Sequence, residues 1–235
     1  KLVFEKAVTV MKNENNVLPI ARFDKKIAVV SIGKYSDDVK AGMDFVTPVD
    51  HFNYTTASEA SAQFGSKISS YDMVITTLHA GSMRPYQDYK LPTGWKAWLT
   101  KVGTAKESVL ALLGSPLALQ NVKEIDGIDA VITGYENNTL MKNRIGQFIM
   151  GTYASSGKLP MTVDDRFKDG DGVDVVWAGR LKDSQPEELG IDPDALKKID
   201  EIALNGITSG AFPGCQVAVA IEGKMIYQKS YHHHT

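Results

Sequence analysis

The chain has 235 residues, of which 43% are hydrophobic and 23% charged, as is typical of a globular protein that buries a sizeable core. Its formal net charge is −2 and no run of lysine or arginine occurs, so neither nucleic acid nor an anionic membrane surface is an expected partner. No apolar stretch reaches the roughly 18 residues of a membrane span, so none is predicted.

The first residues predict a helix. Apolar side chains in the range 2–13 fall at near-helical spacing, and an Asn-rich turn followed by Pro19 would end the helix. The chain opens inside this expected helix, without an initiator methionine or a signal peptide. We therefore expect it to be a piece of a longer protein.

Four short apolar runs predict strands that are covered on both faces. Amphipathic helices are predicted between them, one starting at a capping box formed by Thr56 and Glu59, another after a cap at Thr93. The four runs lie at residues 26–32, 73–78, 108–113 and 129–133.

The stretch 134–163 completes this pattern. Residues 137–139 offer capping side chains, and the apolar positions from Met141 to Tyr153 lie on one helical face. Gly157 would end that section, and residues 159–163 read as a last extended segment. Strands that alternate with helices imply right-handed crossovers and a mostly parallel sheet. The predicted fold class is therefore α/β, a three-layer α/β/α sandwich, followed by a C-terminal helix and β-hairpin.

From residue 164 the composition changes. Residues 164–190 are rich in Asp, Gly and Lys with little periodicity, which indicates a surface segment or a linker. Their aspartates lack the spacing of an EF-hand loop, so a solvated loop is favoured over a calcium site. We divide the chain into a sandwich domain at 1–165, a linker at 166–190 and a further segment at 191–235.

The last segment predicts one helix and one hairpin. Asp192 and Pro193 are a typical helix start, Gly206 a typical end, and Leu196, Ile199, Ile202 and Ala203 would form the apolar face. Residues 215–221 and 225–228 then read as two strands joined by a tight turn. So few elements bury little apolar area. We therefore expect this segment to pack on the sandwich domain or to form a dimer through the hairpin, rather than to be mobile.

Sequence patterns for familiar catalytic sites are weak. The pattern S-x-x-K occurs at Ser31 to Lys34 and at Ser155 to Lys158, but neither copy is at a helix start, as catalysis would require. Neither G-x-S-x-G nor G-x-G-x-x-G is present.

Two other features have simple interpretations. Cys215, the single cysteine, lies in an apolar run and is expected to be a small buried hydrophobe. The histidines at 232–234 are interpreted as a tag remnant or a frayed end rather than a metal site. No cofactor and no metal are expected.

Two parts of the chain resemble one family. The sequence A-V-T-V-M-K-N-E-N-N-V-L-P-I at 7–20 is similar to the linker helix and loop that enter the C-terminal domain of family 3 glycoside hydrolases. The stretch 134–163, which includes G-K-L-P-M-T-V, is similar to the end of that domain. The resemblance implies a three-layer sandwich whose partner, an N-terminal barrel domain carrying the nucleophilic aspartate, is missing from this chain. It also implies a carbohydrate substrate and a periplasmic or extracellular location for the full-length protein.

The loop after the second predicted strand bears on the type of enzyme. Some family members supply an acid/base glutamate from this loop, but here residues 79–88 read H-A-G-S-M-R-P-Y-Q-D, without one. A carboxylic acid is needed to protonate the glycosidic oxygen in the usual mechanism. The missing glutamate resembles the β-N-acetylhexosaminidase branch, whose acid/base histidine lies on the barrel domain. His79 and Asp88 are possible substitutes.

Four residues are candidates to flank a substrate: His79, Arg84, Tyr86 and Glu136. They follow predicted parallel strands, whose carboxyl ends open on one edge of the sheet. A loop histidine is more often structural, and a capping or barrel-contacting role for Glu136 is somewhat favoured over sugar contact. No residue of this chain is expected to be catalytic.

The C-terminal segment resembles a second family. A helix, then F-P-G and V-A-V-A-I-E-G-K-M-I-Y, is similar to the opening of the serine β-lactamase and penicillin-binding-protein-like family. The resemblance covers only the start of that fold, and its nucleophile pattern would lie beyond Thr235.

The expected function is that of a non-catalytic C-terminal domain of a family 3 glycoside hydrolase, inactive alone, from a parent enzyme for β-N-acetylglucosaminides or related β-glycosides. The alternative is a freestanding carbohydrate- or nucleotide-binding α/β module. A complete small hydrolase would require a nucleophile and base pair that the sequence does not show.

Overall fold

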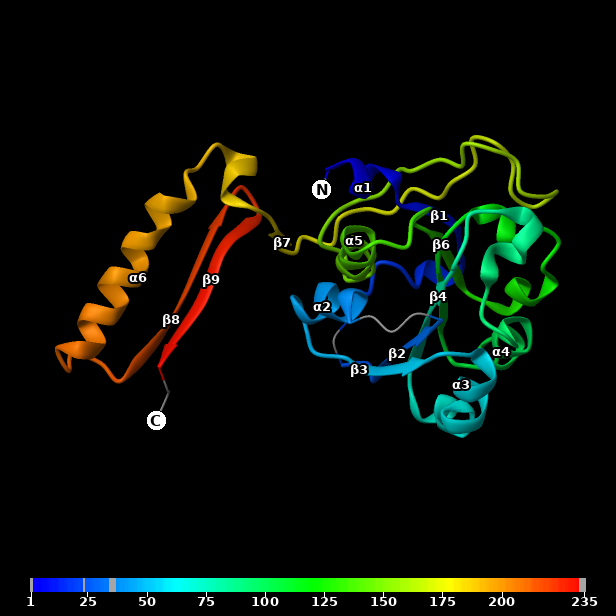
Figure 1. Ribbon diagram of the computed structural model, residues 1–235, viewed down its shortest axis with the longest axis horizontal. Coiled ribbons are helices and arrows are strands. Elements are labelled where there is room, and N and C mark those ends of the chain that lie inside the picture. Colours follow the sequence, from blue (N-terminus) through cyan, green and yellow to red (C-terminus); the bar gives the residue numbers. More distant parts are fainter. Residues whose placement is uncertain (1, 23, 34–36, 233–235) are drawn as a thin grey trace. The chain divides into compact units, whose positions relative to one another are not determined.

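The computed structural model describes residues 2–22, 24–33 and 37–232. These residues form two compact units, which divide between Gly179 and Arg180. The first unit contains a large sheet with helices, and the second contains one long helix and a small sheet (Figure 1).

The first unit is built on a six-stranded sheet with the order β1-β6-β5-β4-β2-β3. All neighbours are parallel except β1, which runs antiparallel to β6. This mostly parallel sheet confirms the predicted fold class, and the four predicted strands correspond to β2, β4, β5 and β6. The strands are β1 (Thr9–Asn13), β2 (Ile27–Ile32), β3 (Asp50–Tyr54), β4 (Met73–His79), β5 (Ser108–Leu113) and β6 (Ala130–Thr133).

Helices cover both faces of this sheet (Figure 1). The strands are apolar on both sides for this reason: along β2, Val29 packs in the cluster under α2 and α5, while Val30 packs in the cluster under α3 and α4. The α-helices are α1 (Leu2–Ala7), α2 (Asp38–Asp44), α3 (Ala57–Gln63), α4 (Trp95–Val102) and α5 (Thr139–Ile149). Short 3-10 helices are η1 (Glu14–Asn16), η2 (Gly65–Ser70), η3 (Pro85–Lys90), η4 (Pro116–Leu119) and η5 (Lys123–Gly127).

Helices α2 and α5 approach each other backbone to backbone. A Cβ atom on Gly42 would lie 2.2 Å from the carbonyl oxygen of Asn143, and one on Gly146 would lie 2.2 Å from that of Val39. Any larger residue would force the helices apart, so glycine is required at both positions.

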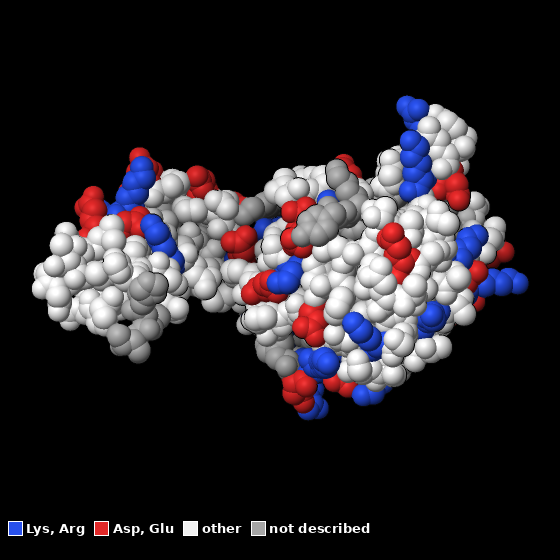
Figure 2. Space-filling view, turned by 60° about the horizontal axis from the view of Figure 1, so that its bottom comes forward, with Lys and Arg blue, Asp and Glu red and all other residues white. Residues whose placement is uncertain are grey.

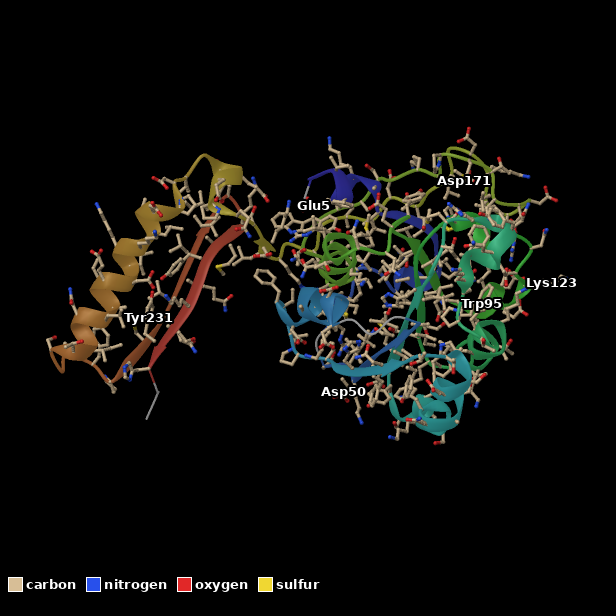
Figure 3. All side chains as sticks on the ribbon, in the orientation of Figure 1. Glu5, Asp50, Trp95, Lys123, Asp171 and Tyr231 are labelled. Atoms are coloured by element: carbon tan, nitrogen blue, oxygen red, sulfur yellow. The ribbon has the colours of Figure 1, made fainter. Side chains whose placement is uncertain are left out.

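Helix α1 carries Glu5, which Figure 3 labels, and a buried ion pair of this residue holds the helix beside α5. Arg144 Nη1 lies 3.2 Å from Glu5 Oε1, and the two residues are 1% and 6% exposed. The Tyr153 hydroxyl donates to the carbonyl of Arg144 at 2.7 Å. Pairing and hydrogen bonding offset the cost of burying both charges.

The predicted helix at 2–13 is wrong in its second half. Helix α1 ends at Ala7, and β1 starts at Thr9. Val8 and Val10 are fully buried in one core cluster and Met11 in the other, which is the alternation of a strand. Pairing with β6 at the edge of the sheet overrides the local helical spacing.

Two predicted helix caps and the predicted extended segment at 159–163 differ in their outcomes. The capping box at Thr56 is present, but Thr93 is not a cap: Gly94, with φ of 82°, precedes α4. Residues 159–163 form no strand and instead hydrogen-bond to the segment that returns at 167–171. Helix α2 and strand β3 were not predicted from the sequence.

The start of the predicted linker is packed on the first unit. Phe167 and Val175 are 7% and 4% exposed, and Val175 forms a β-bridge with Ser155. The backbone N–H of Val173 donates to the carbonyl of Val10 at 2.8 Å. The structural division after residue 179 therefore falls later than the predicted boundary at residue 165.

The second unit contains the predicted helix and hairpin. Asp192 caps the helix, and Glu222 and Gly223 form the hairpin turn with φ of 51° and 74°. Its sheet has the order β7-β9-β8, so β8 is an edge strand and the expected dimer stays a prediction. The elements are β7 (Lys182–Asp183), η6 (Pro186–Leu189), α6 (Pro193–Thr208), β8 (Gly214–Ile221) and β9 (Lys224–His232).

Three details of this unit differ from prediction. Helix α6 continues past Gly206 to Thr208, and Ile202, expected on its apolar face, is 71% exposed. Cys215 is half-buried rather than buried. No helix in the described part of the chain has the length and apolar composition of a membrane-spanning segment.

Candidate functional site

The carboxyl ends of the parallel strands β2, β4, β5 and β6 lie at one edge of the main sheet. A hollow of about 500 Å³ lies there, between the loops that follow β4 and β6. Open α/β sheets bind ligands at this edge, so the hollow is the candidate site. It is lined by Ala80, Gly81, Ser82, Met83, Glu136, Asn137 and Asn138.

Two adjacent asparagines organise the hollow. Asn137 joins the two loops, because its Nδ2 donates to the Ala80 carbonyl at 3.0 Å while its Oδ1 lies 3.1 Å from Nδ1 of His79. Asn138 caps α5, and its Oδ1 accepts from the N–H of Met141 at 2.9 Å. Asn137 thus holds together the two loops that form the wall of the hollow, and Asn138 caps helix α5.

Glu136 stands at the mouth of the hollow and is exposed. The chain leaves β6 through Tyr135, whose φ of 64° turns it sharply out of the sheet. The Glu136 carboxylate accepts a hydrogen bond from the side-chain amide of Asn138. In this position it can accept further hydrogen bonds from the hydroxyl groups of a ligand.

His79 lies behind the wall rather than in the hollow. It is 2% exposed, and burial lowers its pKa to about 4, so the imidazole is neutral at neutral pH. Its contact with Asn137 positions that side chain. Of the two roles considered for this histidine, its burial fits the structural one.

Arg84 and Tyr86 are not among the residues that line the hollow. Both are exposed, Tyr86 to 75%, and Arg84 Nη1 donates to the Tyr86 hydroxyl at 2.7 Å. The structure therefore brings Glu136 and, through Asn137, His79 to the hollow, and it pairs Arg84 with Tyr86 outside it.

The hollow holds an incomplete set of groups for glycoside hydrolysis. Among its described lining residues Glu136 is the one carboxylate, and Asp88 is exposed on η3 outside it. The usual mechanism requires two carboxyl groups on either side of the scissile bond. The hollow can therefore bind hydroxyl groups, but it lacks the second carboxyl group.

The S-x-x-K pattern at Ser155 to Lys158 forms no catalytic pair. Lys158 Nζ bonds to the Gly172 carbonyl at 2.6 Å and to Asp174 Oδ1 at 2.9 Å, while the Ser155 hydroxyl donates to the Val8 carbonyl. Ser31 is buried within β2, and Lys34 lies outside the described residues.

Acidic and basic side chains are interspersed on the face of the first unit that Figure 2 shows. Within the described ranges no three His, Cys, Asp or Glu side chains are grouped so that they could hold a metal ion. His233 and His234 lie outside those ranges, so the tag interpretation stays a prediction.

Asn137 and the short segment 80–83 line the hollow but were not among the candidate residues predicted from the sequence. Asn137 was noted only as a potential helix cap, whereas the actual cap is its neighbour. The available signal was the run of polar residues Glu136, Asn137 and Asn138 shortly after a buried strand, because parallel strands present such positions at one edge.

A comparison with models of known families gives one match. The family model described as the glycosyl hydrolase family 3 C-terminal domain matches residues 8–189. No curated protein matches the chain.

Solved structures share the fold. A beta-glucosidase from Listeria innocua in complex with gluconolactone is 20% identical with a TM-score of 0.53, over 69% of this chain and 26% of its own. The Beta-D-glucoside glucohydrolase from Trichoderma reesei is 13% identical with a TM-score of 0.56, over 74% and 36%. A glycoside hydrolase family 3 beta-N-acetylglucosaminidase from Paenibacillus sp. str. FPU-7 is 12% identical with a TM-score of 0.52, over 69% and 32%. The matched region thus spans only about a quarter to a third of the length of these proteins.

Proposed function

Because the chain belongs to the glycosyl hydrolase family 3 C-terminal domain family, we propose that it is the non-catalytic α/β domain of a family 3 glycoside hydrolase. In this proposal the hollow at the carboxyl edge of the sheet flanks a sugar that a separate barrel domain holds and cleaves. The observation that carries it is the composition of the hollow, in which Glu136 is the one carboxylate among the described lining residues. A surface with one carboxylate and two amides suits hydrogen bonding to sugar hydroxyls, and catalysis would need a second carboxyl group.

We further propose that the parent enzyme acts on β-N-acetylglucosaminides or related β-glycosides. The loop after β4 supports this, since residues 80–83 contribute no carboxylate to the hollow and the acid would have to come from elsewhere. A β-N-acetylglucosaminidase is among the solved structures with a similar fold, beside the β-glucosidases.

Residues 191–235 are proposed to be the start of a serine β-lactamase-like domain. The family model ends at residue 189, just before α6 begins at Pro193. The supporting features are the order helix, Phe212-Pro213-Gly214 and hairpin, which follow one another without insertion.

An activity assay tests the first proposal. Purified chain should not turn over an aryl N-acetylglucosaminide or an aryl glucoside above a buffer blank. Turnover that co-purifies with the chain, is lost in Glu136→Gln and persists in Glu201→Gln, an exposed glutamate of α6, would place catalysis in this domain and refute the proposal.

Sugar binding tests the flanking role separately. Backbone amide signals at 80–83 and 136–138 should shift when N-acetylglucosamine is added at millimolar concentration, and Glu136→Gln should weaken the response. Shifts confined to other residues would contradict the flanking role. A response that saturates at micromolar sugar or nucleotide would instead favour the freestanding binding module, which the size of the hollow also permits.

A further inference from the structure

A line of polar side chains crosses the sheet beneath α2 and α5, where the surrounding core is apolar. Ser31, Thr77 and His79 are no more than 2% exposed, and the His51 side chain is 3% exposed. The line runs from the candidate site across β4, β2 and β3 to the start of α2, in the order Asn137, His79, Thr77, Ser31, His51 and Asp37.

The first half of the line starts at the candidate site. His79 Nδ1 lies 3.1 Å from Asn137 Oδ1, and His79 Nε2 lies 2.9 Å from the hydroxyl of Thr77. Thr77 Oγ1 donates to Ser31 Oγ at 2.8 Å, a contact between register partners of two parallel strands.

The second half reaches the surface. Ser31 Oγ lies 2.8 Å from His51 Nε2, and His51 Nδ1 lies 3.3 Å from Asp37 Oδ1. The Asp37 side chain is 58% exposed and lines a second hollow of about 370 Å³, together with His51, Asn53 and residues of α2. This end of the line is therefore open to solvent.

Both ends of the line are hydrogen-bond acceptors. Asn137 directs its Oδ1 at His79 because its Nδ2 is engaged by the Ala80 carbonyl, and Asp37 presents a carboxylate. Between these ends, two neutral imidazoles and two hydroxyls carry four protons, whereas the line has five contacts. One further proton would complete every contact.

Two arrangements of five protons satisfy all contacts. In one, Thr77 donates to Ser31, Ser31 donates to His51, and His79 is the cation. In the other, every one of these inner bonds is reversed and His51 is the cation. The heavy atoms occupy the same positions in both, so the two arrangements differ only in where the protons lie.

We propose that this line is a proton relay, which takes up one proton from solvent at His51 and passes it across the sheet to His79 beside the candidate site. In the transfer, His51 Nε2 gives its proton to Ser31 Oγ, Ser31 gives its own to Thr77 Oγ1, and Thr77 gives its own to His79 Nε2. Each bond to hydrogen that breaks is replaced by one that forms, and one positive charge moves from His51 to His79. The relay goes beyond the proposed function and does not depend on it.

The charges around the relay favour entry at His51. Burial, as the largest cause, lowers the pKa of His51, and the Asp37 carboxylate opposes this effect; Lys40 of α2, whose amine pairs with Asp44 of the same helix, lowers the pKa further. Near His79, burial and Lys142 of α5 lower the pKa, and Lys142 lies 3.5 Å from Asp38 of α2. Burial lowers the pKa of both imidazoles, and the Asp37 carboxylate in contact with His51 opposes this effect there, so His51 holds the proton more readily than His79.

The relay accepts one proton and excludes a second. If both imidazoles were cations, Thr77 and Ser31 would each have to direct a proton into their single shared contact. One hydroxyl would then have to turn away and lose its partner in a buried position, which is unfavourable. The two histidines should therefore titrate as one unit.

The test is an NMR titration of the full chain labelled at histidine, with His51 and His79 assigned from His→Gln variants. We expect signals of both imidazoles to move together at one midpoint between about pH 8 and about pH 4, with uptake of one proton by the pair. In Thr77→Val the contact between the strands is lost, and the midpoints should separate by about one pH unit or more. Thr77→Ser should restore the common midpoint.

Thr76→Val is the matched control, because Thr76 is the adjacent residue of β4 and accepts from Trp98 Nε1 at 3.0 Å on the opposite face. It should leave the common midpoint unchanged. If Thr77→Val does not fold, Ser31→Ala interrupts the same line. The titration of the native chain by itself also tests whether the two imidazoles share one midpoint. Two independent protonations in the native chain, or a common midpoint that survives loss of the hydroxyl, overturn the proposal.

Discussion

At the scale of single residues, the burial of His79 has a consequence for stability. Burial, as the largest cause, lowers the pKa of this imidazole from 6.5 to about 4. The unfolded chain therefore takes up a proton at this position at higher pH than the folded chain does, and the free energy of unfolding falls as pH falls. The effect develops between about pH 6.5 and about pH 4 and amounts to roughly 3 kcal/mol at its lower end.

Denaturant unfolding at a series of pH values measures this dependence. In His79→Gln the slope of the free energy of unfolding against pH should be smaller in this range. His232→Gln, which changes an exposed histidine, should keep the native slope. Equal slopes in all three proteins would contradict the assignment to His79.

The positions of some candidate site residues could be predicted from the sequence, and those of others could not. Glu136 was identifiable because it follows closely after β6, a strand that is easily recognised, and the structure places it at the hollow. Arg84 and Tyr86 lie farther from the end of β4, in a loop that contains η3 with positive φ at Asp88 and Tyr89, and they do not line the hollow. Backbone conformations of this kind depend on the whole loop, so residue types and spacing do not determine them.

At the scale of helices and strands, the close packing of α2 against α5 leaves no room for an added Cβ atom. We expect Gly146→Ala to destabilise the first unit by about 1–3 kcal/mol, because its Cβ would lie 2.2 Å from a backbone oxygen that cannot move without its helix. Gly127→Ala is the control, since a Cβ there would make an ordinary contact at 3.7 Å. Thermal unfolding of both variants gives the comparison, and an equal loss of stability in the two would contradict this account.

Strands were predicted correctly where the local sequence pattern and the packing in the folded protein indicate the same structure. Strands β2, β4 and β5 are continuous apolar runs because helices cover both faces of the sheet, and this burial is visible in the sequence. Strand β1 was read as helix because its identity comes from pairing with β6, which lies far along the chain. Strand β3 escaped notice because it is an edge strand whose residues are exposed or half-buried, so its sequence carries no apolar run.

At the scale of the whole molecule, the division after Gly179 predicts where a protease cuts first. The last backbone bond of the first unit is Ala178 N–H to the Gly151 carbonyl, and the first of the second unit is Lys182 N–H to the Gly223 carbonyl. Limited trypsin treatment should therefore cleave at Arg180 before any site between residues 164 and 178.

Calorimetry should then show which unit is the more stable. The second unit has few fully buried apolar side chains, chiefly Ala203, Ile226 and Tyr231, so its transition should occur at the lower temperature. The fragment that ends at Arg180 should keep the transition of the first unit. Early cleavage within 164–178, or loss of that transition after the cut, would show that the boundary is misplaced.

The contact between Val173 and Val10 also sets an order of events during synthesis. Strand β1 is synthesised before its partners, and one of its backbone partners follows more than a hundred residues later. The β6 strand that pairs with β1 is likewise distant in sequence. The nascent chain must therefore keep β1 without its partners until β6 has been synthesised, and the bond to Val173 forms later still.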